Sequence, residues 1–200
     1  MQSGNVSSSK SRKNLLIFYF LVSFAILGCA FGIFCYLYSE NRICDKILFF
    51  HHEMFGISYS EKVSAVLFDS LKSNVVFLIT AFILGFGALS QPVQALLIFI
   101  KGFSCGTVLI SIYGNGLSGS DLPCIAAVFP GMFISLIVII IAARESFFLS
   151  ERLFRLCFTD RLADGLFLRV RTYAVRFSVY AAMLSVCSLI DCGLSIILSV

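Results

Sequence analysis

Long apolar stretches alternate with short polar segments along the chain, and this alternation is its dominant pattern. A helix needs roughly 20 apolar residues to cross the hydrocarbon core of a bilayer. We interpret five stretches as membrane spans, at residues 15–38, 75–89, 93–113, 122–143 and 174–200. The pattern therefore predicts an all-α fold, a polytopic transmembrane helical bundle.

Two of these spans have competing interpretations. A secretory signal peptide is the alternative for the first, but its apolar run continues past Cys29 to Tyr38, which favours an uncleaved helix. Pro92 follows Ser90-Gln91 and favours a turn between the second and third spans, because proline disfavours helix in the residue before it. The alternative is one kinked helix over residues 75–100, with a re-entrant segment at 102–113. In the fourth span, Pro130-Gly131 predicts a kink or a break.

The remaining segments divide the chain into a tail, residues 1–13, and a single membrane domain, residues 14–200. An outer loop is expected at residues 39–73 and an arginine-rich inner loop at residues 144–173. Both loops contain apolar residues at helical spacing, around Val63–Leu71 and Leu153–Phe158, so we expect interfacial amphipathic helices there. Helices that merely cover the ends of the bundle are an equal alternative.

Composition and charge agree with a membrane protein and orient it. Hydrophobic residues make up 59% of the 200 residues and charged residues 13%, against about 25% charged in soluble domains. With the N-terminus inside, ten Lys and Arg residues lie on the cytoplasmic side and four outside, as the positive-inside rule requires. We therefore expect a bacterial cell-membrane protein with a cytoplasmic N-terminus and an external C-terminus. Basic residues beside apolar runs argue against nucleic-acid binding.

No pattern of residues predicts catalysis, a cofactor or a metal site. His51-His52-Glu53 is the only cluster of candidate ligands, and adjacent histidines point in different directions. The eight cysteines form no C-x-x-C pair, and most lie in apolar runs, so neither zinc nor a disulfide framework is expected. We therefore expect no enzyme activity.

Two ionisable residues do lie within spans, Lys101 and Asp191. Such groups are costly in hydrocarbon and must find partners. The opposite charges of Lys101 and Asp191 could pair, but the two residues lie at different depths in the predicted spans. We therefore favour separate hydrogen bonds to backbone carbonyls or to serines such as Ser104, Ser185 and Ser195. Gly28-x-x-x-Gly32 and Gly102-x-x-x-Gly106 predict close helix packing, within the bundle or with another chain.

The middle of the chain resembles the stage II sporulation protein M family. The resemblance rests on Ser73-Asn74 at the start of an apolar helix, on Gly85-x-Gly87, on Pro92, and on Lys101-Gly102-Phe103-x-x-Gly106. A glycine-rich loop and Phe129-Pro130 in the next helix extend it to residues 13–198. The chain departs from the family pattern at Ser90, where a glycine is typical, and after Pro130, which predicts a divergent member.

The resemblance implies a structural role in forespore engulfment. It implies a non-catalytic scaffold that anchors and localises two peptidoglycan-degrading partners, a membrane-anchored transglycosylase and an amidase. The site residues are then structural: Lys101, Asp191, Pro92, Gly102, Gly106, Pro130 and Gly131. The alternative function is a transporter or permease subunit, because broken helices and intramembrane charges also serve substrate binding. A homo-oligomer is compatible with either.

Overall fold

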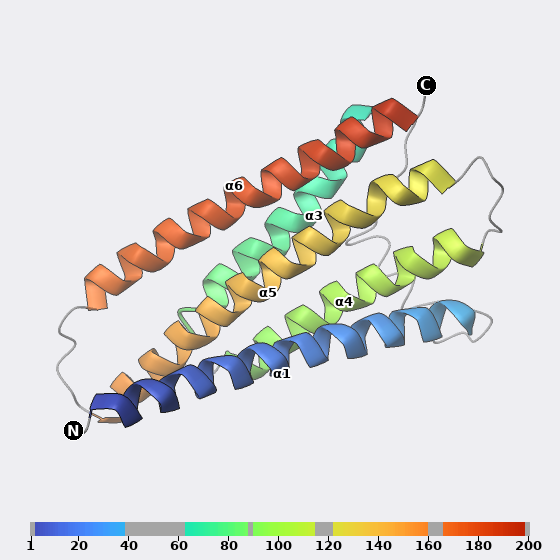
Figure 1. The fold of residues 1–200 in the computed structure, drawn as a ribbon. Coiled ribbons are helices and arrows are strands. Elements are labelled where there is room, and N and C mark those ends of the chain that lie inside the picture. The colour runs from blue at the N-terminus through green and yellow to red at the C-terminus, as the bar shows by residue number, and fades with distance from the viewer. Residues whose placement is uncertain (1–2, 39–62, 88–89, 115–121, 160–165, 199–200) are drawn as a thin grey trace.

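The protein is a bundle of long helices. The structure, a computed structural model, describes residues 3–38, 63–87, 90–114, 122–159 and 166–198. Within these residues the helices are α1 (Ser3–Leu37), α3 (Val63–Leu84), α4 (Gln91–Gly114), α5 (Leu122–Thr159) and α6 (Leu166–Leu198). The described helices alternate in direction along the chain, so α1 and α4, which are separated by α3, run the same way (Figure 1). The all-α bundle is thus as predicted.

The helices form two groups that meet on α5 and between α3 and α4. One group is the pair α1 and α4, and the other joins α3, α5 and α6, while α5 also contacts α1 and α4 (Figure 1). Buried apolar side chains from every helix form one core, for example Leu21, Phe77, Ile98, Ile139 and Leu184. The outward faces carry exposed residues such as Leu16, Ile83, Leu96 and Val186. An apolar outer surface over an apolar core is expected where lipid is the solvent.

Four of the described helices contain a stretch long and apolar enough to cross a membrane, Asn14–Leu37, Gln91–Ile110, Gly131–Phe154 and Arg169–Ile190. In α3 the corresponding stretch, Leu71–Leu84, is shorter. The protein is therefore a multi-pass membrane protein, and the crossing by α3 that completes a five-span arrangement stays a prediction. The N- and C-terminal ends of the chain lie at opposite ends of the bundle (Figure 1).

Several helix bounds differ from the predictions. The helix that contains most of the second predicted span, α3, runs from Val63 to Leu84. The separate surface helix expected in the outer loop is therefore the first part of α3. No glycine or proline occurs between Val63 and Leu84, so nothing interrupts the helix. Likewise α5 continues from its span to Thr159 and α6 begins at Leu166, so much of the predicted inner loop is helical.

The break expected at Pro130-Gly131 is absent. Helix α5 is continuous from Leu122 to Thr159 and passes through both residues. Proline removes a single N–H donor, whereas a break within the membrane would leave several backbone groups without water to bind. Between α3 and α4, in contrast, the described residues 85–87 and 90 are not helical.

Candidate functional site

Lys101 is buried between α4 and α3, with 6% of its surface exposed. Its Nζ donates a hydrogen bond of 2.9 Å to Oδ1 of Asn74. The same nitrogen lies 5.0 Å from the centroid of the Phe77 ring. A neutral amide oxygen and an aromatic face both stabilise a cation without adding a second charge to the interior. The arrangement ties α3 to α4 in the middle of the bundle.

Asn74 is the residue of this pair that the sequence reasoning missed as a partner. It is 4% exposed and opens the apolar part of α3. The signal was present: an amide one helical turn before Phe77 faces the same side as that ring. Asp191 lies in α6, but its side chain lies outside the described residues, so the direct Lys101–Asp191 pair stays untested. Ser185, one of the serines named as possible partners, donates to the Ala181 carbonyl of its own helix.

A second polar cluster surrounds the point where α3 ends. We call it the polar cap. It consists of five buried residues: Ser90 directly before α4, Gln94 of α4, Ser146 and Ser150 of α5, and Tyr173 of α6. The last carbonyls of a helix have no partner within that helix, and in hydrocarbon each unsatisfied carbonyl costs several kcal/mol.

The hydroxyl groups of the polar cap donate to these carbonyls. Ser146 Oγ donates to the carbonyl of Ala81 at 2.7 Å, and Tyr173 Oη donates to that of Phe82 at 3.1 Å. Ser150 Oγ donates to the carbonyl of Gly87 at 2.7 Å. Ser90 Oγ lies within hydrogen-bonding reach of the carbonyls of Leu84 and Gly87. The backbone N–H groups of Gly85, Phe86 and Gly87 also donate to the last carbonyls of α3. The end of α3 is therefore capped both by the turn that follows it and by side chains of its neighbours.

Gln94 lies at the centre of the polar cap and is fully buried. Its Nε2 donates to Ser146 Oγ at 2.9 Å and to Ser90 Oγ at 3.2 Å. Its Oε1 has no hydrogen-bond partner in the structure. Gly85 completes the arrangement, because a Cβ there would lie 2.8 Å from Cζ of Tyr173. The departure at Ser90 from the glycine of the family pattern thus supplies a hydroxyl to this network.

The predicted glycine motifs pack against each other within the bundle. A Cβ at Gly32 of α1 would lie 2.5 Å from the carbonyl oxygen of Phe103 in α4. A Cβ at Gly102 of α4 would lie 3.0 Å from the carbonyl carbon of Ala25 in α1. Gly28 and Gly106 meet the opposite backbone equally closely. We call these four residues the glycine seam. The sequence left open whether they contact another helix of the bundle or another chain, and in the structure they contact each other's helices within the bundle.

The remaining predicted site residues have local roles. Pro92 is exposed and is the second residue of α4, directly after Gln91. Proline suits the first turn of a helix because its missing N–H would have no helical partner. Pro130 lies in the continuous part of α5, with its side chain outside the described residues, and Gly131 is buried one residue later.

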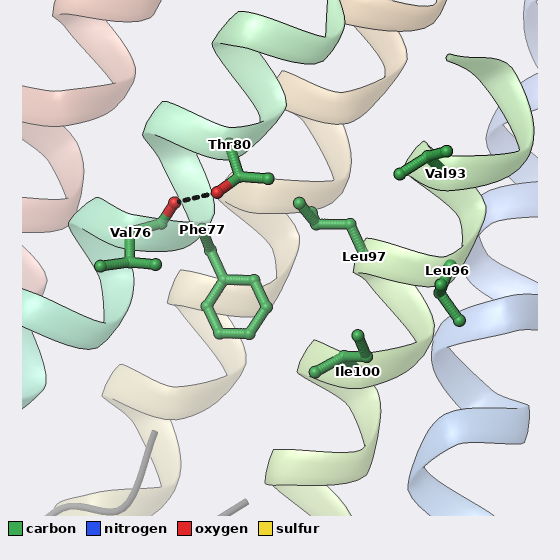
Figure 2. Close-up of a pocket in the computed structure, with 7 residues that line it drawn as sticks. All are labelled: Val76, Phe77, Thr80, Val93, Leu96, Leu97 and Ile100. Atoms are coloured by element: carbon green, nitrogen blue, oxygen red, sulfur yellow. Dashed lines mark hydrogen bonds between the residues drawn. The ribbon is translucent and has the colours of Figure 1, made fainter. Parts of the chain in front are cut away.

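A groove opens between α3 and α4, where the two helices are packed less closely (Figure 2). Its volume is about 150 Å³, and it is lined by Val76, Phe77, Thr80, Val93, Leu96, Leu97 and Ile100. The one hydroxyl in this lining, that of Thr80, donates to the carbonyl of Val76 in its own helix at 2.8 Å. The groove therefore presents an apolar surface and no convergent polar groups to recognise a polar substrate.

The described residues contain no group of three or more His, Cys, Asp or Glu side chains that could hold a metal ion. His51-His52-Glu53 lies outside them. Cys29, Cys35, Cys105 and Cys187 form no disulfide, and the side chains of the other four cysteines lie outside the described residues. Several of the described buried polar groups form contacts between helices.

Comparison with known proteins agrees with the resemblance found in the sequence. No curated protein and no solved structure matches the chain. A family model, described as Stage II sporulation protein M, matches residues 18–194, which include the glycine seam, Lys101, Asn74 and the polar cap. The chain belongs to the stage II sporulation protein M family.

Proposed function

We propose that this protein is a non-catalytic membrane scaffold that anchors and localises peptidoglycan-degrading enzymes during forespore engulfment. The observation that carries the proposal is the family match over residues 18–194. The packing supports it, since Lys101 is engaged by Asn74 and the hydroxyl groups of the polar cap are engaged by α3. Interactions of this kind hold helices in fixed positions, which is what a scaffold requires.

The partners of the proposed scaffold are a membrane-anchored transglycosylase and an amidase, as the family resemblance implies. These enzymes act on the wall, outside the membrane. With the N-terminus inside and the C-terminus outside, the outer segment at residues 39–73 is the part of the chain that reaches them. The two ends of the chain lie at opposite ends of the bundle (Figure 1), which is compatible with this orientation.

Deletion of the gene in its sporulating host tests the scaffold. A septum that forms but is not engulfed, with both wall enzymes mislocalised, is the expected phenotype. A gene carrying Ala30→Leu, a change on an exposed face of α1, serves as the matched control and restores engulfment. Normal engulfment in the deletion strain would contradict the proposal.

The alternative of a transporter subunit is favoured by one observation, a buried lysine close to a groove between two helices. The two functions separate on Lys101→Met. A scaffold loses stability or partner assembly, and it loses function only to that extent. A transporter remains folded and assembled but loses flux, which complementation combined with co-purification of the wall enzymes distinguishes.

A further inference from the structure

Two arginine residues occupy matching positions on α5 and α6, toward one end of the seam between these helices. An ion pair shows which residues of these antiparallel helices lie opposite each other, because Arg176 Nη1 of α6 lies 2.6 Å from Glu145 Oε2 of α5. Seven residues make nearly two helical turns, so the residue seven positions away returns to the same face about 10 Å along the axis. Arg152 is seven residues after Glu145, and Arg169 is seven residues before Arg176. Both therefore lie about 10 Å beyond the ion pair, on the same side of the seam.

The cations of this pair are accessible, and no group of opposite charge pairs with them within the described helices. Arg152 and Arg169 are both exposed. Neither has an ion-pair or hydrogen-bond partner among the residues that the structure describes. Glu151 is adjacent to Arg152 in the chain, but a one-residue step turns the helix by about 100°, which points it away from that face. Two guanidinium groups on one side of a seam repel each other unless an anion lies between them.

The depth of the two arginines identifies the kind of anion. Arg169 lies three residues after the start of α6 at Leu166, and Arg152 lies seven residues before the end of α5 at Thr159. Charged residues interrupt the apolar runs of both helices there, at Glu151, Arg152, Arg169 and Arg171. The apolar stretch of α1, which begins at Asn14, starts at the same end of the bundle (Figure 1). Positions at the end of an apolar stretch lie at the level of the lipid headgroups. The anions fixed at this level are the phosphates of the membrane lipids.

We propose that Arg152 and Arg169 together bind the headgroup phosphate of one anionic phospholipid at the inner end of the α5–α6 seam. Guanidinium groups recognise phosphate oxygens through paired, charge-assisted hydrogen bonds. Basic pockets between membrane helices on the cytoplasmic side are a known setting for anionic lipids. Below the phosphate, the acyl chains would lie along the exposed apolar residues of α6, such as Val175 and Val179. An acidic segment of a partner protein would carry the same charge, but the headgroup depth favours the lipid.

The test is lipid retention by the full-length protein, taken from vesicles of phosphatidylcholine and phosphatidylglycerol and measured by native mass spectrometry. The double variant R152Q/R169Q is expected to retain about tenfold less phosphatidylglycerol, while phosphatidylcholine is unchanged. R152K/R169K keeps the charge and recovers part of the binding. The matched control R12Q/R171Q removes two exposed charges from the same end of the bundle and changes retention at most about twofold.

Four outcomes would overturn the proposal: unchanged retention in R152Q/R169Q, an equal loss in the control, an equal loss of phosphatidylcholine, or displacement of the lipid by inorganic phosphate. Loss of a co-purifying protein with unchanged lipid would also reject it in favour of an acidic protein partner. Because both side chains are exposed, the variants are expected to unfold at the wild-type midpoint in detergent, and a lowered midpoint accompanied by equal loss of both lipids counts against the site. The result does not depend on the role in engulfment.

Discussion

The glycine seam and the polar cap join helices in opposite ways. At the seam, Gly28, Gly32, Gly102 and Gly106 remove side chains so that the backbones of α1 and α4 come into contact. At the cap, serine, glutamine and tyrosine side chains cross from α4, α5 and α6 to carbonyls at the end of α3. The first interface relies on shape and dispersion, and the second on hydrogen bonds to groups that lipid cannot satisfy. An interface made of backbone should tolerate added volume worst, and one made of several hydrogen bonds should lose stability in small steps.

The largest effect is expected at the glycine seam. Gly28→Leu places a side chain against the backbone of Phe99 and Phe103, which cannot rotate away, so the helices must separate. We expect a loss of about 3 kcal/mol in the free energy of unfolding, measured by titration with a denaturing detergent in mixed micelles. Ala30→Leu on the exposed face of the same helix should change it by less than about 0.5 kcal/mol. Equal losses in the two variants would show that close approach is not what the glycines provide.

The next largest effect is expected at the Lys101–Asn74 pair, where removing Asn74 should cost more stability than removing Lys101. Asn74→Leu leaves the buried ammonium group without its hydrogen-bond acceptor, and we expect a loss of about 2 kcal/mol. Lys101→Met removes the charge itself and should cost about 1 kcal/mol, since only a neutral acceptor is left unpaired. The double variant should be more stable than Asn74→Leu alone, in the same detergent titration. A double variant whose loss is the sum of the two single losses would show that the pair does not interact.

Within the polar cap, single hydroxyl groups should contribute little each. Ser146→Ala removes the hydrogen bond to Ala81 and one acceptor of Gln94, and we expect a loss of about 1 kcal/mol. The amide hydrogens around residues 85–87 should also exchange faster, which hydrogen-exchange mass spectrometry measures. In the control Ser178→Ala, the hydroxyl donates only to its own helix, and the variant should be neutral. If both variants behave alike, the cap does not hold the end of α3.

The smallest effect is expected for the ion pair between Arg176 and Glu145, which belongs to neither interface. The two side chains are 52% and 24% exposed, and pairs of this exposure contribute about 0.5 kcal/mol or less. Glu145→Gln should therefore shift the unfolding free energy by no more than this amount, with the difference vanishing at high salt. A loss as large as that of Ser146→Ala would place the pair in a less solvated environment than its exposure indicates.

Much of the candidate site was visible in the sequence as residues but not as contacts. Lys101 stands out because a lysine in an apolar run is costly, and the two Gly-x-x-x-Gly motifs stand out by their spacing. Asn74, Gln94, Ser146, Ser150 and Tyr173 do not, because polar residues of these types are common in membrane helices and no local pattern distinguishes a buried one. Gly85-x-Gly87 was noted only as part of the family resemblance, and the structure explains its first glycine through the ring of Tyr173.

By itself the sequence determined that this protein is an all-α membrane bundle, since the length and apolarity of each helix depend on its own stretch of sequence. It overestimated the breaks: Pro130-Gly131 and the ends of the loops remain helical, because a membrane penalises unpaired backbone more than it penalises one missing donor. Only the tertiary structure decided that α1 pairs with α4, that Lys101 meets Asn74, and that three helices cap the end of α3. Those choices join residues distant in sequence, and they depend on which helix faces are free to meet once the core is packed.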